Sequence, residues 1–87
     1  LVIDMASRQV SRDGLPIELT AREFAILELL TRSRGAVVAR ATIYEHIYDD
    51  ETDVLSNVID VHVAALRRKL GADLIRTRRG EGYLIDA

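Results

Sequence analysis

One segment constrains the fold of this 87-residue chain more than any other: NVIDVHVAALRRKL, from Asn57 to Leu70. Read at helical spacing, it carries an apolar stripe that would pack a helix on a core, formed by Ile59, Val63, Leu66 and Leu70. A second apolar group lies on the other side, where a surface helix carries charge: Val58, Val61, Ala64 and Ala65. The segment therefore predicts a helix with a partner on each side, the protein core on one and something external on the other.

The residues at the start of the chain predict a small antiparallel sheet. Residues 1–3 and 8–10 are β-prone, and Asp13-Gly14 is a tight-turn signal before a run of alternating apolar residues, so a hairpin is expected. Pro16 has no N–H to donate to a ladder, and it therefore belongs on an edge strand.

Two further helices are predicted before the long one. Thr20 and Glu23 form a capping box, which starts a helix that Gly35 is expected to stop. A short helix follows over residues 40–48. Its predicted buried residues are Ile43 and Ile47.

The last residues predict a second hairpin, which is strongly basic. Two β-prone runs, 74–78 and 83–85, flank a glycine-bearing turn. The arginines of this hairpin are Arg76, Arg78 and Arg79. The order of sheet, three helices and hairpin predicts an α+β winged helix-turn-helix fold, in one domain spanning residues 1–87.

The net charge of −2 hides an uneven distribution. Residues 1–61 carry six arginines against eleven Asp or Glu, whereas residues 62–87 carry six Lys or Arg against three Asp or Glu. The helix dipole accounts for cations at 67–69 but not for the three arginines of the hairpin. A cationic end on an acidic body predicts an anionic partner that binds at one place.

The sequence lacks the residues that several classes of function require. The chain has no cysteine, which excludes disulfides and thiolate nucleophiles and fits an intracellular, cytoplasmic setting. His46 and His62 lack ligand spacing, so we expect neither a metal nor another cofactor. No nucleophile elbow, phosphate loop or paired-carboxylate motif predicts catalytic residues, and no apolar run is long enough to span a membrane. Because the chain begins inside a predicted strand, we expect a domain of a longer protein.

In a winged-helix fold the long helix enters the major groove, so its outer side would face the bases of DNA. Asn57 can pair with adenine through two hydrogen bonds, and Val61 can contact a thymine methyl group. Arg68 and Lys69 suit phosphates. Two alternatives stay open: the outer apolar residues pack on the second helix or on a partner domain, and His62 is a plain surface histidine.

Three stretches together resemble the C-terminal DNA-binding domain of OmpR/PhoB-family response regulators. They are TAREF at 20–24, VIDVHV at 58–63 with LRRKL at 66–70, and IRTRRGEGY at 75–83, which match in order and spacing over essentially the whole chain. The resemblance implies an N-terminal four-stranded sheet, three helices and a wing. It also implies an upstream receiver domain, absent from this chain, that a sensor histidine kinase phosphorylates.

The same resemblance implies roles for individual residues. The residues that would read bases in the major groove are Asn57, Val61, His62, Ala64 and Ala65, to which Val58 is added from its place on the helical wheel. Those that would hold phosphates are Arg40, Tyr48, Arg68 and Thr77, and the wing residue that would enter the minor groove is Arg79. Lys69 and Arg78 are added to the phosphate-binding set because of their charge. The acidic residues of a loop that could touch RNA polymerase, or be a solvated connection only, are Asp49, Asp50, Glu51 and Asp53.

The expected partner is double-stranded DNA, with promoter direct repeats bound head to tail by two copies of a domain that is monomeric alone. The alternative is a winged-helix module that binds protein and not DNA. That alternative predicts that Arg78 and Arg79 are dispensable and that binding barely depends on salt, whereas DNA binding weakens steeply as salt rises.

Overall fold

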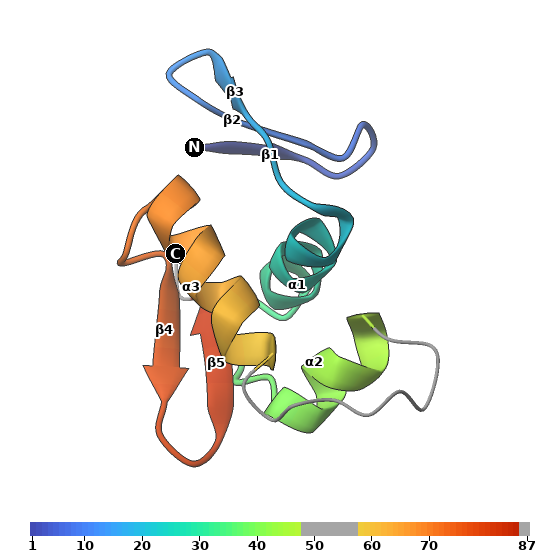
Figure 1. Ribbon diagram of the computed structural model, residues 1–87, viewed down its shortest axis with the longest axis vertical. Coiled ribbons are helices and arrows are strands. Elements are labelled where there is room, and N and C mark those ends of the chain that lie inside the picture. The colour runs from blue at the N-terminus through green and yellow to red at the C-terminus, as the bar shows by residue number, and fades with distance from the viewer. Residues whose placement is uncertain (48–57, 86–87) are drawn as a thin grey trace.

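The computed structural model describes residues 1–47 and 58–85 of the protein (Figure 1). Their elements, in chain order, are β1 (Val2–Asp4), β2 (Gln9–Arg12), β3 (Leu15–Ile17), α1 (Ala21–Arg32), α2 (Arg40–Ile47), α3 (Val58–Leu70), β4 (Ile75–Arg78) and β5 (Gly82–Ile85). This order confirms the predicted winged-helix fold. Figure 1 places the N-terminal sheet at one end of the molecule and the tip of the β4–β5 hairpin, the wing, at the other.

The N-terminal sheet is antiparallel, with the strand order β1-β2-β3. Asp13 and Gly14 both have positive φ, 53° and 81°, as the predicted tight turn requires, and Pro16 lies on the edge strand β3 as expected. The four strands implied by the resemblance are not found in residues 1–47, where the sheet has three. The chain passes from β3 almost directly into the cap of α1, which leaves no length for another strand.

The capping box of α1 is confirmed. The Glu23 backbone N–H donates to Thr20 Oγ1 at 3.1 Å, and the Thr20 N–H donates to Glu23 Oε1 at 3.0 Å. The helix ends at Arg32, earlier than the Gly35 stop signal suggested. Gly35 instead has a φ of 83° and donates its N–H to the Ile85 carbonyl, so it turns the chain toward the wing.

The core lies where the three helices meet the two sheets. The predicted stripe of α3 is buried throughout: Ile59, Val63, Leu66 and Leu70. It meets the fully buried side chains of α1 and α2, which are Ile26, Leu27, Leu30 and Ile43. Ile47 was predicted to be buried, but it is only half-buried, because it occupies the last turn of α2 and packs at the margin of the core.

The root of the wing is joined to the loop between α1 and α2. Val38 exchanges both backbone hydrogen bonds with Tyr83 of β5, at 2.8 and 3.0 Å. Gly82 makes this close approach possible, because a Cβ added there would lie 2.0 Å from the Val38 carbonyl oxygen. The wing therefore grows out of the body of the domain, and its tip projects beyond α3 (Figure 1).

Candidate nucleic-acid interface

The outer side of α3 is open to solvent. Val61 keeps 59% of its surface exposed, and Ala64, one turn further on, is also exposed. The alternative in which these two residues pack on the second helix is therefore excluded. The outer side of α3 around these two residues is therefore not covered by other described parts of the domain.

The outer surface of α3 is narrower than predicted. Ala65 was predicted to read bases, but it is only 8% exposed and belongs to the buried side, so that prediction is wrong. On the helix it lies one turn after the half-buried His62 and one turn before Lys69, which pairs with Glu23, so it sits on the edge of α3 that faces α1. The predicted roles of Asn57 and of the Val58 side chain lie outside the described residues.

His62 lies beside the start of α1. It is half-buried and shares a shallow hollow with the capping residue Thr20 and with Arg22. It is neither fully outward-facing nor part of the core. The edge of the outer surface of α3 therefore reaches the N-terminus of α1.

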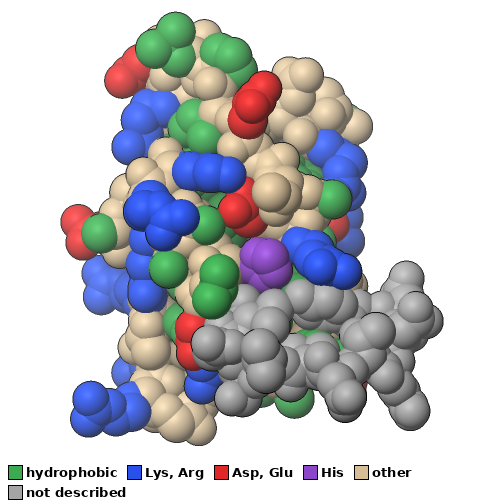
Figure 2. Space-filling view, in the orientation of Figure 1, with side chains coloured by type: hydrophobic (Ala, Val, Ile, Leu, Met, Phe, Trp, Pro, Cys, Tyr) green, Lys and Arg blue, Asp and Glu red, His purple; other side chains and the backbone are tan. Residues whose placement is uncertain are grey.

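Cationic side chains continue the surface from α3 onto the wing. Figure 2 shows Lys and Arg side chains gathering over α3 and the β4–β5 hairpin down to its tip. Three residues predicted to hold phosphates are exposed there, Arg68, Thr77 and Arg78, as is Arg79, predicted to enter the minor groove. Arg40, at the start of α2, is exposed as well. Tyr48 and the acidic residues Asp49, Asp50, Glu51 and Asp53 lie outside the described residues.

Lys69 was predicted to hold a phosphate, but it has a structural partner. Its Nζ lies 2.6 Å from Oε1 of Glu23, whose side chain is almost fully buried. Burial raises the pKa of Glu23, yet hydrogen bonds from Lys69 and Thr20, with the charges of Lys69 and His62, lower it overall. This ion pair joins the end of α3 to the cap of α1, so Lys69 has a structural role, and its contact with a phosphate stays a prediction.

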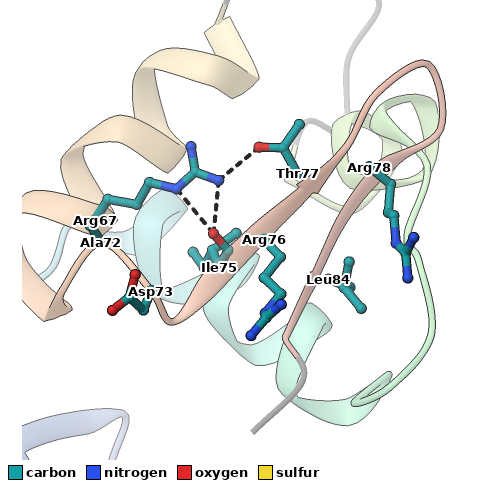
Figure 3. A pocket seen from close by; sticks show the side chains of 8 residues that line it. All are labelled: Arg67, Ala72, Asp73, Ile75, Arg76, Thr77, Arg78 and Leu84. Atoms are coloured by element: carbon teal, nitrogen blue, oxygen red, sulfur yellow. Dashed lines mark hydrogen bonds between the residues drawn. The ribbon is translucent and has the colours of Figure 1, made fainter.

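Arg67 joins α3 to the wing. Its Nε and Nη2 donate to the Ile75 carbonyl at 3.1 and 2.8 Å, and Nη2 also donates to Thr77 Oγ1 at 2.8 Å (Figure 3). The guanidinium carbon lies 5.8 Å from the centre of the Tyr83 ring. Figure 3 shows the hydrogen bonds of Arg67 to Ile75 and Thr77 at one side of a pocket of about 650 Å³ beside β4.

Asp60 of α3 is hydrogen-bonded to residues of α2 and β5, and no sequence pattern predicted this role. Tyr83 is buried at the base of the wing, and its hydroxyl donates to Asp60 Oδ1. Arg40 Nη2 donates to Asp60 Oδ2. The hydrogen bond from Tyr83, followed by that from Arg40, lowers the pKa of Asp60 despite partial burial. The only sequence signal for this cluster is an acidic residue in the first turn of a helix that faces basic segments.

The described residues form neither a metal site nor a membrane-spanning helix. Within residues 1–47 and 58–85, no group of three or more His, Cys, Asp or Glu is placed to hold a metal ion. In the same part of the chain, every helix is too short or too polar to cross a membrane.

Comparisons with known proteins agree on one class. The family model described as "Transcriptional regulatory protein, C terminal" matches residues 14–85. The response regulator PmrA of Pseudomonas aeruginosa is 49% identical over 86 residues, which are 99% of this chain and 39% of PmrA. The chain thus spans about two fifths of the length of such relatives.

Solved structures give the same result. The DNA-binding domain of CpxR from Escherichia coli superposes with a TM-score of 0.84 at 33% identity, over 98% of this chain and 88% of that one. The DNA-binding domain of RstA from Klebsiella pneumoniae, in complex with the RstA box, gives a TM-score of 0.82 at 28% identity, over 97% of this chain and 88% of that one.

Proposed function

The chain belongs to the family of C-terminal domains of transcriptional regulatory proteins, and we propose that it binds double-stranded DNA sequence-specifically as the output domain of an OmpR/PhoB-type response regulator. The observation that carries this proposal is the exposed outer side of α3, with Val61 and Ala64, next to exposed arginines on the same helix and on the wing. The similar RstA domain is solved in complex with its DNA box.

In this proposal the outer side of α3 lies in the major groove. Val61 contacts a thymine methyl group, Ala64 lets the helix backbone approach the base edges, and His62 contacts a base at the margin. Asn57 and Val58 complete the base-reading set. The exposure of Val61 and Ala64 supports this placement, because apolar contact with thymine needs side chains that are free in the unbound domain.

Phosphate contacts set the position of the domain on the duplex, and one wing residue reaches the minor groove. The proposed phosphate-binding residues are Arg40, Tyr48, Arg68, Lys69, Thr77 and Arg78. Arg79, at the exposed tip of the wing, enters the minor groove, whose negative potential attracts arginine.

The remainder of the proposal concerns the whole protein. Because the chain spans about two fifths of its relatives, we place a receiver domain upstream, phosphorylated by a sensor histidine kinase in the cytoplasm. Two copies of a domain that is monomeric alone bind direct repeats head to tail, about one DNA turn apart. The acidic segment with Asp49, Asp50, Glu51 and Asp53 contacts RNA polymerase.

The test is a titration of the 87-residue domain against duplexes that it selects from a random library, repeated at several salt concentrations. We expect enrichment of one sequence motif and a logarithm of affinity that falls with the logarithm of salt, by about 0.9 for each phosphate neutralised. A domain that enriches no sequence and binds with no salt dependence would be a protein-binding module instead.

A further inference from the structure

Asp60 accepts hydrogen bonds from two elements that flank its helix on different sides. Oδ1 accepts the Tyr83 hydroxyl of β5, and Oδ2 accepts Nη2 of Arg40, the first residue of α2. The three residues are far apart in the sequence, so only the folded domain brings them together. A single carboxylate in the first turn of α3 therefore connects the wing and the second helix.

The two contacts differ in their surroundings. Tyr83 is 7% exposed, and its backbone is fixed by two hydrogen bonds to Val38, so its hydroxyl offers Asp60 a firm anchor. Arg40 keeps 52% of its side chain exposed, against 41% for Asp60, so this ion pair stays open to solvent. The Asp60 carboxylate, anchored by Tyr83, thus holds the solvent-exposed guanidinium group of Arg40.

Arg40 faces a groove between the start of α2, the start of α3 and the wing. The groove has a volume of about 530 Å³, and its wall includes Thr77, Arg78 and Arg79, with Glu81 at the tip. Arg40, Arg78 and Arg79 therefore all contribute to the wall of one recess. Within residues 1–47 and 58–85, Asp60 is the hydrogen-bond partner of Arg40 and takes up one of the five N–H donors of its guanidinium group.

We propose that Asp60 is a positioning residue for DNA binding: anchored by Tyr83, it presets the Arg40 guanidinium at this groove so that the groove receives one backbone phosphate between the major-groove and minor-groove contacts. The inference rests on the proposed function and extends it to a residue that does not touch DNA itself. An exposed arginine loses rotamer freedom on binding, and a side chain that is already oriented loses less.

Positioning and charge make opposite predictions for Asp60. A carboxylate beside the DNA backbone repels phosphate, so charge alone predicts that Asp60→Asn tightens binding and leaves or steepens the salt slope. Positioning predicts that the same change weakens binding, because Arg40 loses its anchor. The sign of the change therefore separates the two, and a purely structural role would leave the salt slope unaffected.

The experiment titrates the domain and its variants against a selected duplex at several salt concentrations. We expect Asp60→Asn to bind the duplex about tenfold more weakly, which is the effect of losing one charge-assisted contact. The slope of the logarithm of affinity against the logarithm of salt concentration should fall by about one. Arg40→Gln should give the same losses, and the double variant should lose no more than Arg40→Gln alone. Asp73→Asn is the matched control, because it removes an exposed carboxylate near the wing that is not part of the cluster.

Asp60→Glu keeps the charge but moves the carboxylate by one methylene, and it serves if Asp60→Asn does not fold, as judged by circular dichroism. Positioning predicts a loss of affinity for Asp60→Glu, whereas charge alone predicts none. Binding at wild-type strength or better by the folded Asp60 variants would overturn the inference and leave the proposed function intact. A wild-type domain that binds no duplex would overturn both.

Discussion

Gly82 shows how one residue fixes the wing to the domain. Its φ is 150°, and a Cβ there would lie 2.0 Å from the carbonyl oxygen and 2.8 Å from the carbonyl carbon of Val38. Both atoms are backbone, so the chain must separate to admit a methyl group. We expect Gly82→Ala to lower the free energy of unfolding by about 3 kcal/mol, from strain and overpacking together, as measured by urea denaturation.

Gly80, at the tip of the same wing, is the control for this change. It also has a positive φ, 77°, but an added Cβ would meet nothing within 4 Å. Gly80→Ala should therefore cost only the backbone term, about 1 kcal/mol. Equal losses in the two variants would show that the approach of Gly82 to Val38 does not limit stability.

Arg67 acts at the level of elements, since it holds β4 against α3. The Ile75 carbonyl points away from β5 and would be an open acceptor on the edge of the wing sheet without this arginine. We expect Arg67→Met, which keeps most of the side-chain length, to cost about 1–3 kcal/mol and to speed amide exchange in β4 and β5. The neighbouring exposed Arg68, changed to Met, should leave both quantities unchanged; matching exchange rates in the two variants would contradict the role of Arg67.

The ion pair between Glu23 and Lys69 joins α1 to α3 and should respond to pH. The pKa of Glu23 is lowered below its ordinary value of 4.5, so the pair stabilises the fold above that pH and is lost as pH falls through the lower folded-state pKa. We expect Glu23→Gln to cost about 1–2 kcal/mol at neutral pH and to flatten the loss of stability in acid. The same substitution at the exposed Glu18 is the control, and an unchanged acid profile for Glu23→Gln would contradict the assignment.

Across the whole molecule, the sequence predicts what depends on neighbours along the chain. The buried stripe of α3, the capping box at Thr20 and the turn at Asp13 each follow from a local pattern, and all three are confirmed. The cluster around Asp60 joins residues 20 and 23 positions away, and Lys69 meets Glu23 across 46 positions. Such contacts depend on how the helices cross, which periodicity does not encode.

The burial of Ala65 shows the same limit within one helix. Helical spacing places it at the border between the buried and the outer side, and the neighbours that cover it come from the tertiary fold. The predicted set of exposed residues on α3 was therefore correct at its centre, Val61 and Ala64, and wrong at its edge. The contacts of this set with DNA stay predictions.

The distribution of charge over the molecule leads to the last prediction. Arg79 lies at the tip of the wing, at the opposite end of the domain from the N-terminal sheet that carries Arg8 (Figure 1). We expect Arg79→Ala to weaken binding to most DNA sequences by a similar factor and to reduce the salt slope by about one, because a wing cation neutralises backbone charge whatever the bases. Arg8→Ala removes the same charge from the far end and should leave the slope unchanged. If Arg79→Ala kept the wild-type slope while Arg8→Ala lowered it, DNA would lie against the sheet rather than against the wing.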